Sequence, residues 1–336
     1  MNARGFTLIE LLVGIALGWL VVSGALALHQ AVNRSSRQAA ALAELNDTAR
    51  FALAYIETDL RQAGFLGLNG NAESIDGVAG PGDPVAIPVR ADCGPNWAVE
   101  LTTPVTGFNN RYGLDCAPYR GALAGSDVLV VRRAAGRLAR PEAGRLQLHT
   151  SLAGGQLGAD GRAPPSLTPP VETRDVIVGA YYVSRSSSLG TGTPSLRRKV
   201  LQAGPRVVDE ELMPGVEDLQ LQLGLDLDPP GTPGRGSVDV WVNPEDPRLD
   251  DTDARVAGAR IWLLVGTDDP VRTARAPLPA YADRAAPAPA DRRRLLVARS
   301  YACLLYTSPS PRDRHLDLVC RLLLENRGGG GGGGGG

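Results

Sequence analysis

The stretch GFTLIELLVGIALG, Gly5 to Gly18, opens an apolar run that extends from Phe6 to Leu28 and contains one carboxylate, Glu10. A helix through this run would be about 34 Å long at 1.5 Å per residue, which is enough to cross the roughly 30 Å hydrocarbon core of a bilayer. A carboxylate at the centre of a bilayer costs several kcal/mol, but the cost falls near the amino end of a span. There Glu10 could gain from the helix dipole or pair with a cation. The run therefore predicts a membrane-spanning helix with an acidic group near its start.

A cleaved secretory signal is the main alternative for this segment, because Ala25-Leu26-Ala27 imitates a small-x-small cleavage site. The apolar run is longer than the roughly 7 to 15 residues of a signal's hydrophobic region, and Glu10 would lie inside that region. Both features favour a retained span.

Four cysteines are present, Cys93, Cys116, Cys303 and Cys320, and none belongs to a CxxC or Cys/His cluster. Cys93 and Cys116 flank a stretch rich in Gly, Pro and Asn, which favours a disulfide-closed loop over two unrelated buried thiols. The positive charges around the span mildly favour a cytoplasmic head. A disulfide needs an oxidising compartment, so we expect the head outside the cytoplasm.

The opening stretch closely resembles the prepilin signature of type IV pilins and type II secretion pseudopilins, with its residues on Gly5, Phe6 and Glu10. The resemblance implies that a prepilin peptidase cleaves after Gly5, that Phe6 becomes the N-methylated first residue, and that the helix packs in a filament core. Cleavage would also place the new α-amine of Phe6 within one helical turn of Glu10, which gives the carboxylate its cation.

A second helix-like pattern follows the span. No proline intervenes between Gln30 and Gly64, and apolar residues recur three or four apart, which predicts an amphipathic helix stopped by Gly64. The apolar face comprises Leu42, Leu45, Ala49, Leu53, Ile56, Leu60 and Ala63. The predicted solvent face carries Glu44, Asp47, Arg50, Glu57, Asp59 and Arg61.

Within this helix, ARFALAYIETDLRQAGFLG (Ala49 to Gly67) resembles the PilW type of minor pilin, whose pattern falls on Arg50, Ala52, Asp59, Leu60, Arg61, Ala63 and Gly64. Two further stretches resemble that family, PGVEDLQLQLGLDLD (Pro214 to Asp228) and ARIWLLV (Ala259 to Val265). The resemblance implies a minor pilin rather than a major one.

Beyond Gly67 the pattern changes to short strand-like runs between Gly- and Pro-rich connections, with long loops expected at Ala153 to Pro170 and Pro270 to Pro289. Leucines alternate with other residues from Leu219 to Leu227, which predicts a strand with one buried and one wet face. We therefore expect an α+β fold in which an antiparallel sheet packs on the second half of the long helix. The expected strands are Val85 to Val89, Ala98 to Leu101, Asp127 to Arg132, Arg145 to His149, Asp175 to Val183, Val216 to Leu227, Ala259 to Val265 and Arg293 to Arg299.

The predicted organisation has five parts: a leader at 1–5, a transmembrane or filament-core helix at 6–28, an amphipathic helix at 29–64, a β-rich head at 65–301, and a tail at 302–336. The tail contains CLLYTSPSPRDR, which resembles a translated sequencing adapter, and ends in the glycine run Gly328 to Gly336. We therefore expect the tail to be non-native.

Catalytic chemistry has no support in the sequence. The three histidines have no metal-like spacing, and no nucleophile, phosphate-loop or zincin motif is present. The stretch from Asp226 to Gly231 matches three positions of a calcium loop, but Pro230 and Ser237 stand where ligands are needed, so no metal or other cofactor is predicted. The formal net charge of −1 and the lack of aromatic residues among the arginines at Arg132, Arg133 and Arg292 to Arg294 argue against nucleic acid, and these arginines are expected at solvated strand ends.

The sequence thus predicts a non-enzymatic minor pilin that helps to prime a type IV pilus. Its expected partners are the prepilin peptidase, other minor pilins, the major pilin and the inner membrane, with the head in the periplasm. A minor pseudopilin of type II secretion is the nearest alternative, and a membrane-anchored periplasmic binding domain is a more distant one.

Overall fold

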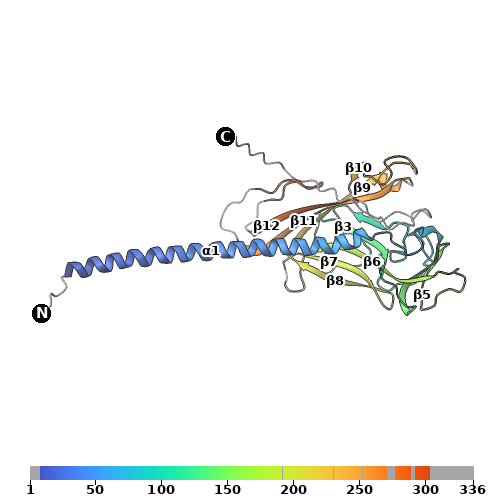
Figure 1. Ribbon diagram of the computed structural model, residues 1–336, viewed down its shortest axis with the longest axis horizontal. Helices are drawn as coiled ribbons and strands as arrows, with labels where there is room; N and C mark the ends of the chain where they lie inside the picture. Colours follow the sequence, from blue (N-terminus) through green and yellow to red (C-terminus); the bar gives the residue numbers. More distant parts are fainter. Residues whose placement is uncertain are drawn as a thin grey trace, which may run out of the picture.

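The computed structural model describes residues 8–190, 192–229, 231–251, 253–270, 277–288 and 292–302. It consists of one long helix, α1 (Leu8–Arg61), that projects from a β-rich head (Figure 1). Gly5, Phe6, Cys303, Cys320 and the predicted tail beyond Ala302 lie outside the described residues.

Helix α1 divides into an exposed half and a docked half. Its 54 residues would span about 81 Å at 1.5 Å per residue. Every residue from Leu8 to Ala40 is exposed, and burial begins at Ala41 and recurs along one face as far as Leu60. The predicted apolar face is buried except for Leu42, which is 39% exposed because the helix is only entering the head at that point.

The helix ends where the sequence predicts a stop. Gly64 has a φ of +74°, in the left-handed region that glycine adopts without a Cβ penalty, and its N–H donates to the Arg132 carbonyl at 3.0 Å. This hydrogen bond ties the chain that leaves α1 to the sheet.

The head contains two sheets. The first has eight strands in the order β1-β5-β4-β6-β3-β2, with β7 also paired to β6 and β8 paired to β7. Its strands are β1 (Ile75–Asp76), β2 (Val105–Phe108), β3 (Val128–Ala134), β4 (Ala143–Thr150), β5 (Gly155–Asp160), β6 (Glu172–Ser184), β7 (Ser195–Gln202) and β8 (Arg206–Pro214). The second sheet has the order β10-β9-β11-β12, with β9 (Val216–Asp226), β10 (Val240–Val242), β11 (Arg255–Pro270) and β12 (Arg292–Ala302). Apart from the parallel β1–β5 pair, the pairings between these strands are antiparallel. Two short 3₁₀ helices, η1 (Ala72–Ser74) and η2 (Pro247–Asp250), lie in connections.

Helix α1 packs against both sheets. It contacts β11 and β12 of the second sheet and β3 and β8 of the first. In the view of Figure 1, α1 runs between the strands β11 and β12 and the strands β7 and β8. Leu45, Ile56 and Leu60 of the helix are at most 1% exposed and share one hydrophobic cluster with Leu129 and Leu219 of the two sheets. A second cluster covers the opposite face of the eight-stranded sheet, beneath the connections between α1 and β3. The predicted α+β fold with a helix packed on antiparallel strands is confirmed.

Six of the eight predicted strands coincide with β3, β4, β6, β9, β11 and β12. The predictions at Val85 to Val89 and Ala98 to Leu101 are wrong, since these runs form bends and turns. Strand β5 lies within the stretch predicted to be a loop at Ala153 to Pro170, and β7 and β8 were not predicted.

The wet face predicted for β9 is also wrong. Gln220 is fully buried and Asp226 is 2% exposed. The connection before β3 covers this face, where the Gln220 amide donates to the Gly125 carbonyl at 2.8 Å.

Candidate assembly helix and its anchor in the head

The projecting half of α1 is an apolar surface. Its large hydrophobic side chains between Leu8 and Val32 are each 50% to 78% exposed. By length and composition, α1 is the one described helix that could cross a membrane. An uncovered apolar surface of this size marks contact with lipid or with other protein. The helix is therefore built to be buried by something outside this chain.

Glu10 lies in the first described turn of that apolar half. At the amino end of a helix, a carboxylate interacts favourably with the helix dipole. Its predicted processing partners, Gly5 and Phe6, precede the described residues, so the distance from Glu10 to the Phe6 amine stays a prediction.

Asp59 anchors the other half of α1 to the head. Its Oδ1 accepts hydrogen bonds from Arg133 Nε at 3.1 Å and Nη2 at 2.8 Å, and its Oδ2 accepts one from the Tyr181 hydroxyl at 2.5 Å. Arg198 completes an ion pair with Oδ2 at 3.6 Å. The prediction that Asp59 lies on the solvent face is wrong, since it is 5% exposed. These groups come from α1, β3, β6 and β7, so one carboxylate joins the helix to three strands.

The Tyr181 hydroxyl acts as a hydrogen-bond donor in this anchor. Burial, and secondarily the Asp59 carboxylate, raise the pKa of Tyr181, so the phenol stays protonated and donates its hydrogen bond. Gln62, one turn further along, accepts from Arg133 Nη1 at 2.8 Å. A buried charge is tolerated when it is paired and hydrogen-bonded in this way.

The arginine pair on β3 is buried as well, which corrects its predicted place at a solvated strand end. Arg132 and Arg133 are 5% and 8% exposed. Arg132 forms an ion pair with Glu100 at 3.1 Å and donates to the Trp97 carbonyl at 3.0 Å. Arg133 thus joins the sheet to α1 on one face, and Arg132 joins it to the loops on the other face.

The hairpin β7–β8 carries a ladder of opposite charges that was missed at the sequence level. Three basic residues face three acidic ones in register: Arg197 opposite Glu211, Arg198 opposite Glu210, and Lys199 opposite Asp209. The signal was present in the order RRK followed by DEE across a short AGP connection, because antiparallel pairing brings such runs together.

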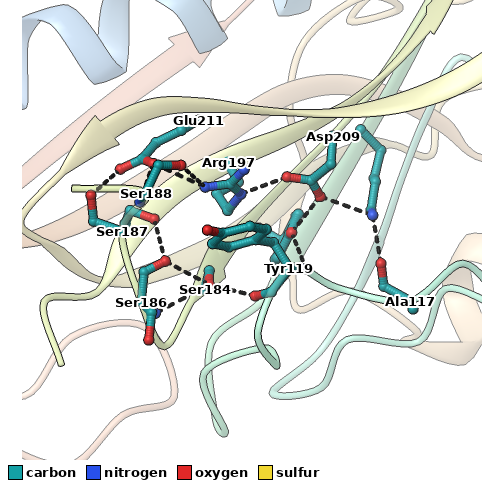
Figure 2. A network of polar contacts seen from close by, with 12 residues as sticks. Ala117, Tyr119, Ser184, Ser186, Ser187, Ser188, Arg197, Asp209 and Glu211 are labelled. Carbon is teal, nitrogen blue, oxygen red and sulfur yellow. Dashed lines mark hydrogen bonds and ion pairs between the residues drawn. The ribbon is translucent and has the colours of Figure 1, made fainter. Parts of the chain in front are cut away.

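One face of this ladder forms a polar network that ties loops to the sheet (Figure 2). The Arg197 guanidinium lies 3.8 Å from the centre of the Tyr119 ring and bonds Asp209 at 2.5 Å and Glu211 at 3.0 Å. Glu211 also accepts from the Ser187 hydroxyl and the Ser188 N–H, which hold the β6–β7 connection. These contacts are structural, because each charge is matched within the chain.

The predicted pairing of Cys93 with Cys116 is present as a disulfide. Cys93 is 3% exposed and belongs to the second hydrophobic cluster, and the Tyr112 ring packs edge-on against Tyr182 at 5.0 Å beside it. The bridge thus closes the loop that covers the sheet face opposite α1.

Asp226 and Asp228 come together with Asp239, which was not singled out in the sequence, so that one oxygen from each lies within 4.8 Å of the others. No other group of this kind occurs among the residues that the structure describes. Arg235 lies 3.6 Å from Asp226 and donates to the Asp228 carbonyl, while the Gly236 and Leu227 N–H groups donate to Asp226 and Asp239. Arg235 and the backbone N–H groups of the loop already interact with these residues. The geometry therefore does not strengthen the case for a metal site.

An apolar helix that projects from a β-rich head, into which its second half is docked, defines a pilin-like architecture. Two family models match the chain: the prokaryotic N-terminal methylation motif over residues 1–26, and Type IV Pilus-assembly protein W over residues 180–304. The two matches support the PilW-type pilin that the resemblance predicted and relate the chain to the type IV pilus. These families point to a structural rather than an enzymatic protein. Neither a curated protein nor a solved structure matches it.

Proposed function

We propose that this chain is a minor pilin made as a prepilin, cut after Gly5 by a prepilin peptidase and N-methylated at Phe6. The mature subunit joins other minor pilins and the major pilin to prime a type IV pilus. The observation that carries the proposal is the uncovered half of α1, Leu8 to Ala40, which is predominantly apolar as far as Leu28 and continues without a break into a docked half. The proposal requires no cofactor and no nucleic acid.

Before assembly, the apolar half lies in the inner membrane as a single span, and the head lies in the periplasm. The length and composition of α1 support the span, and the Cys93–Cys116 disulfide supports an oxidising compartment. The leader at 1–5 remains on the cytoplasmic side until cleavage.

Glu10 then sets the position of the helix in the filament. Inside a bundle of apolar helices, a carboxylate is stable only when it is paired, and the methylated amine of Phe6, from the same or a neighbouring subunit, supplies the cation. One charge pair in a low-dielectric bundle fixes the register between subunits.

The proposal is tested by measuring how much of the chain is recovered in sheared pili. Glu10→Ala should leave the processed mass unchanged but reduce incorporation, because the charge pair is lost. Glu44→Ala is the matched control, since it removes an exposed carboxylate from the same helix outside the apolar half. Normal incorporation of Glu10→Ala would contradict the proposed role.

The pseudopilin alternative makes a different prediction. Deletion of this chain would then abolish type II secretion while leaving pili unchanged in number, whereas the proposal expects pili to be lost and secretion to continue.

A further inference from the structure

An open groove runs beside the docked half of α1, on the side away from β11 and β12. It has a volume of about 370 Å³, and its rim includes two aromatic side chains of the helix, Phe51 and Tyr55. These side chains are 61% and 49% exposed, on the face of α1 opposite the one that packs in the core. Ala54, between them, keeps the groove wide.

The floor of the groove is charged. It is formed by Asp59, Arg133 and Arg198 of the helix anchor. Asp59 is already hydrogen-bonded by Arg133 and Tyr181. Of the three charged side chains, Arg198 is the most exposed, at 18% against 10% for Arg133 and 7% for Asp59, so an incoming group meets a cation first.

Arg198 is placed to bind an incoming anion. Its ion pairs are long, 3.6 Å to Asp59 and 3.3 Å to Glu210. Its side chain is 18% exposed. A carboxylate that reached the groove could form a charge-assisted hydrogen bond with this guanidinium that is shorter than either of its present pairs.

We propose that this groove docks a neighbouring pilin subunit, which places an apolar side chain between Phe51 and Tyr55 and a carboxylate on Arg198. The inference rests on the proposed function. Continuity of the helix supports it: Phe51 lies about 17 Å along α1 from Ala40, where the fully exposed part of the helix ends. A subunit packed along that part therefore reaches the groove, and its contact would extend from apolar helix packing to a directed charge pair.

The first experiment uses a photo-crosslinking amino acid at Tyr55 in the full chain assembled into pili. The crosslinked peptide is then sequenced by mass spectrometry. We expect a peptide from a pilin subunit with an aspartate or glutamate beside apolar residues. A peptide from any other class of protein, a pilin peptide without a carboxylate, or no crosslink from incorporated chain would overturn the inference.

The second experiment compares variants by their recovery in sheared pili. Phe51→Ser combined with Tyr55→Ser should lower incorporation about tenfold, which corresponds to about 1.4 kcal/mol. Arg198→Lys should lower it less, because a cation remains beside Asp59 while the planar guanidinium is lost. Leu189→Ser is the matched control, since Leu189 is 87% exposed in the β6–β7 connection and lies outside the groove.

The two proposals fail in different ways. If Glu10→Ala reduces incorporation while the groove variants incorporate like the Leu189→Ser control, only the groove inference is wrong. If Glu10→Ala also incorporates normally, the proposed function is wrong. Unchanged thermal unfolding of the serine variants, whose parent side chains are exposed, separates a docking effect from misfolding.

Discussion

The buried carboxylate of Asp59 should decide whether α1 stays docked to the head. Asp59→Asn removes the negative charge but keeps the size of the side chain, and it leaves Arg133, which is 8% exposed, without its counter-ion. Breaking a buried ion pair by removing one partner costs about 3 to 5 kcal/mol. Asparagine retains one carbonyl acceptor for Arg133 or Tyr181, so we expect a loss near the lower end, about 3 kcal/mol.

For a folded unit of 150 to 250 residues, each kcal/mol lowers the melting temperature by roughly 2 to 4 °C, so Asp59→Asn should lower it by about 6 to 12 °C. The assay is thermal unfolding of the full mature chain in detergent, followed by near-ultraviolet circular dichroism. Asp47→Asn is the matched control, because Asp47 is an exposed carboxylate on the same helix and should change stability by less than about 0.5 kcal/mol. The double variant Asp59→Asn, Arg133→Gln should recover part of the loss, since the unpaired charge is gone. A melting temperature for Asp59→Asn equal to that of Asp47→Asn would refute the anchor.

Three further predictions concern the stability of the head. Burial, with the nearby carboxylates of Asp283 and Asp218, raises the pKa of Asp127 to about 7 from an ordinary value of 3.8, so the folded state binds a proton that the unfolded chain releases. The melting temperature should therefore rise as the pH falls from 8 to 5, and Asp127→Asn should flatten this dependence in a pH series of melts. Replacing Cys93 and Cys116 by serine opens a loop of sequence separation 23 and should cost about 3 kcal/mol in a denaturant titration, where equal midpoints would contradict a stabilising bridge. Ile56→Ala, at a fully buried position between the helix and the sheets, should cost about 2 to 5 kcal/mol by the same titration, whereas Leu189→Ala should cost almost nothing.

The parts of the fold that follow from periodicity could be predicted. The three-to-four spacing of Leu45, Ala49, Leu53, Ile56 and Leu60 places one face of α1 in the core. The apolar runs of β9 and β11 identify the strands of the second sheet. Gly64 stops the helix for a local reason, its positive φ, which the sequence also signals.

The anchor could not be predicted in the same way. Periodicity assigns a charged residue such as Asp59 to solvent, and only the arrival of Arg133 and Tyr181 from distant strands makes its burial favourable. The resemblance had nevertheless marked Asp59 within the PilW-type pattern, and the structure gives that position a physical role.

Strands were predicted wrongly where tertiary packing, rather than hydrophobic alternation, determines the local structure. Val85 to Val89 looks apolar but contains Pro88 and follows Pro84, and Val85 is 67% exposed. Strands β7 and β8 carry charged residues on both faces, so no hydrophobic alternation identifies them. Arg197, Arg198 and Lys199 each lie opposite an acidic residue across the pair, which stabilises it. The groove beside Phe51 could not be predicted either, because Arg198, which helps to line it, comes from the unpredicted strand β7.

We expect this chain to become a pilus subunit only after cleavage at Gly5. Mass spectrometry of the amino-terminal peptide of the chain recovered from sheared pili tests this step. The peptide should begin at Phe6 and carry one methyl group on its α-amine, and a bulky substitution of Gly5 should leave the full-length chain in the membrane fraction. A peptide that begins at Met1 in assembled pili, or one that follows a cut after Ala27, would show that cleavage at Gly5 is not required.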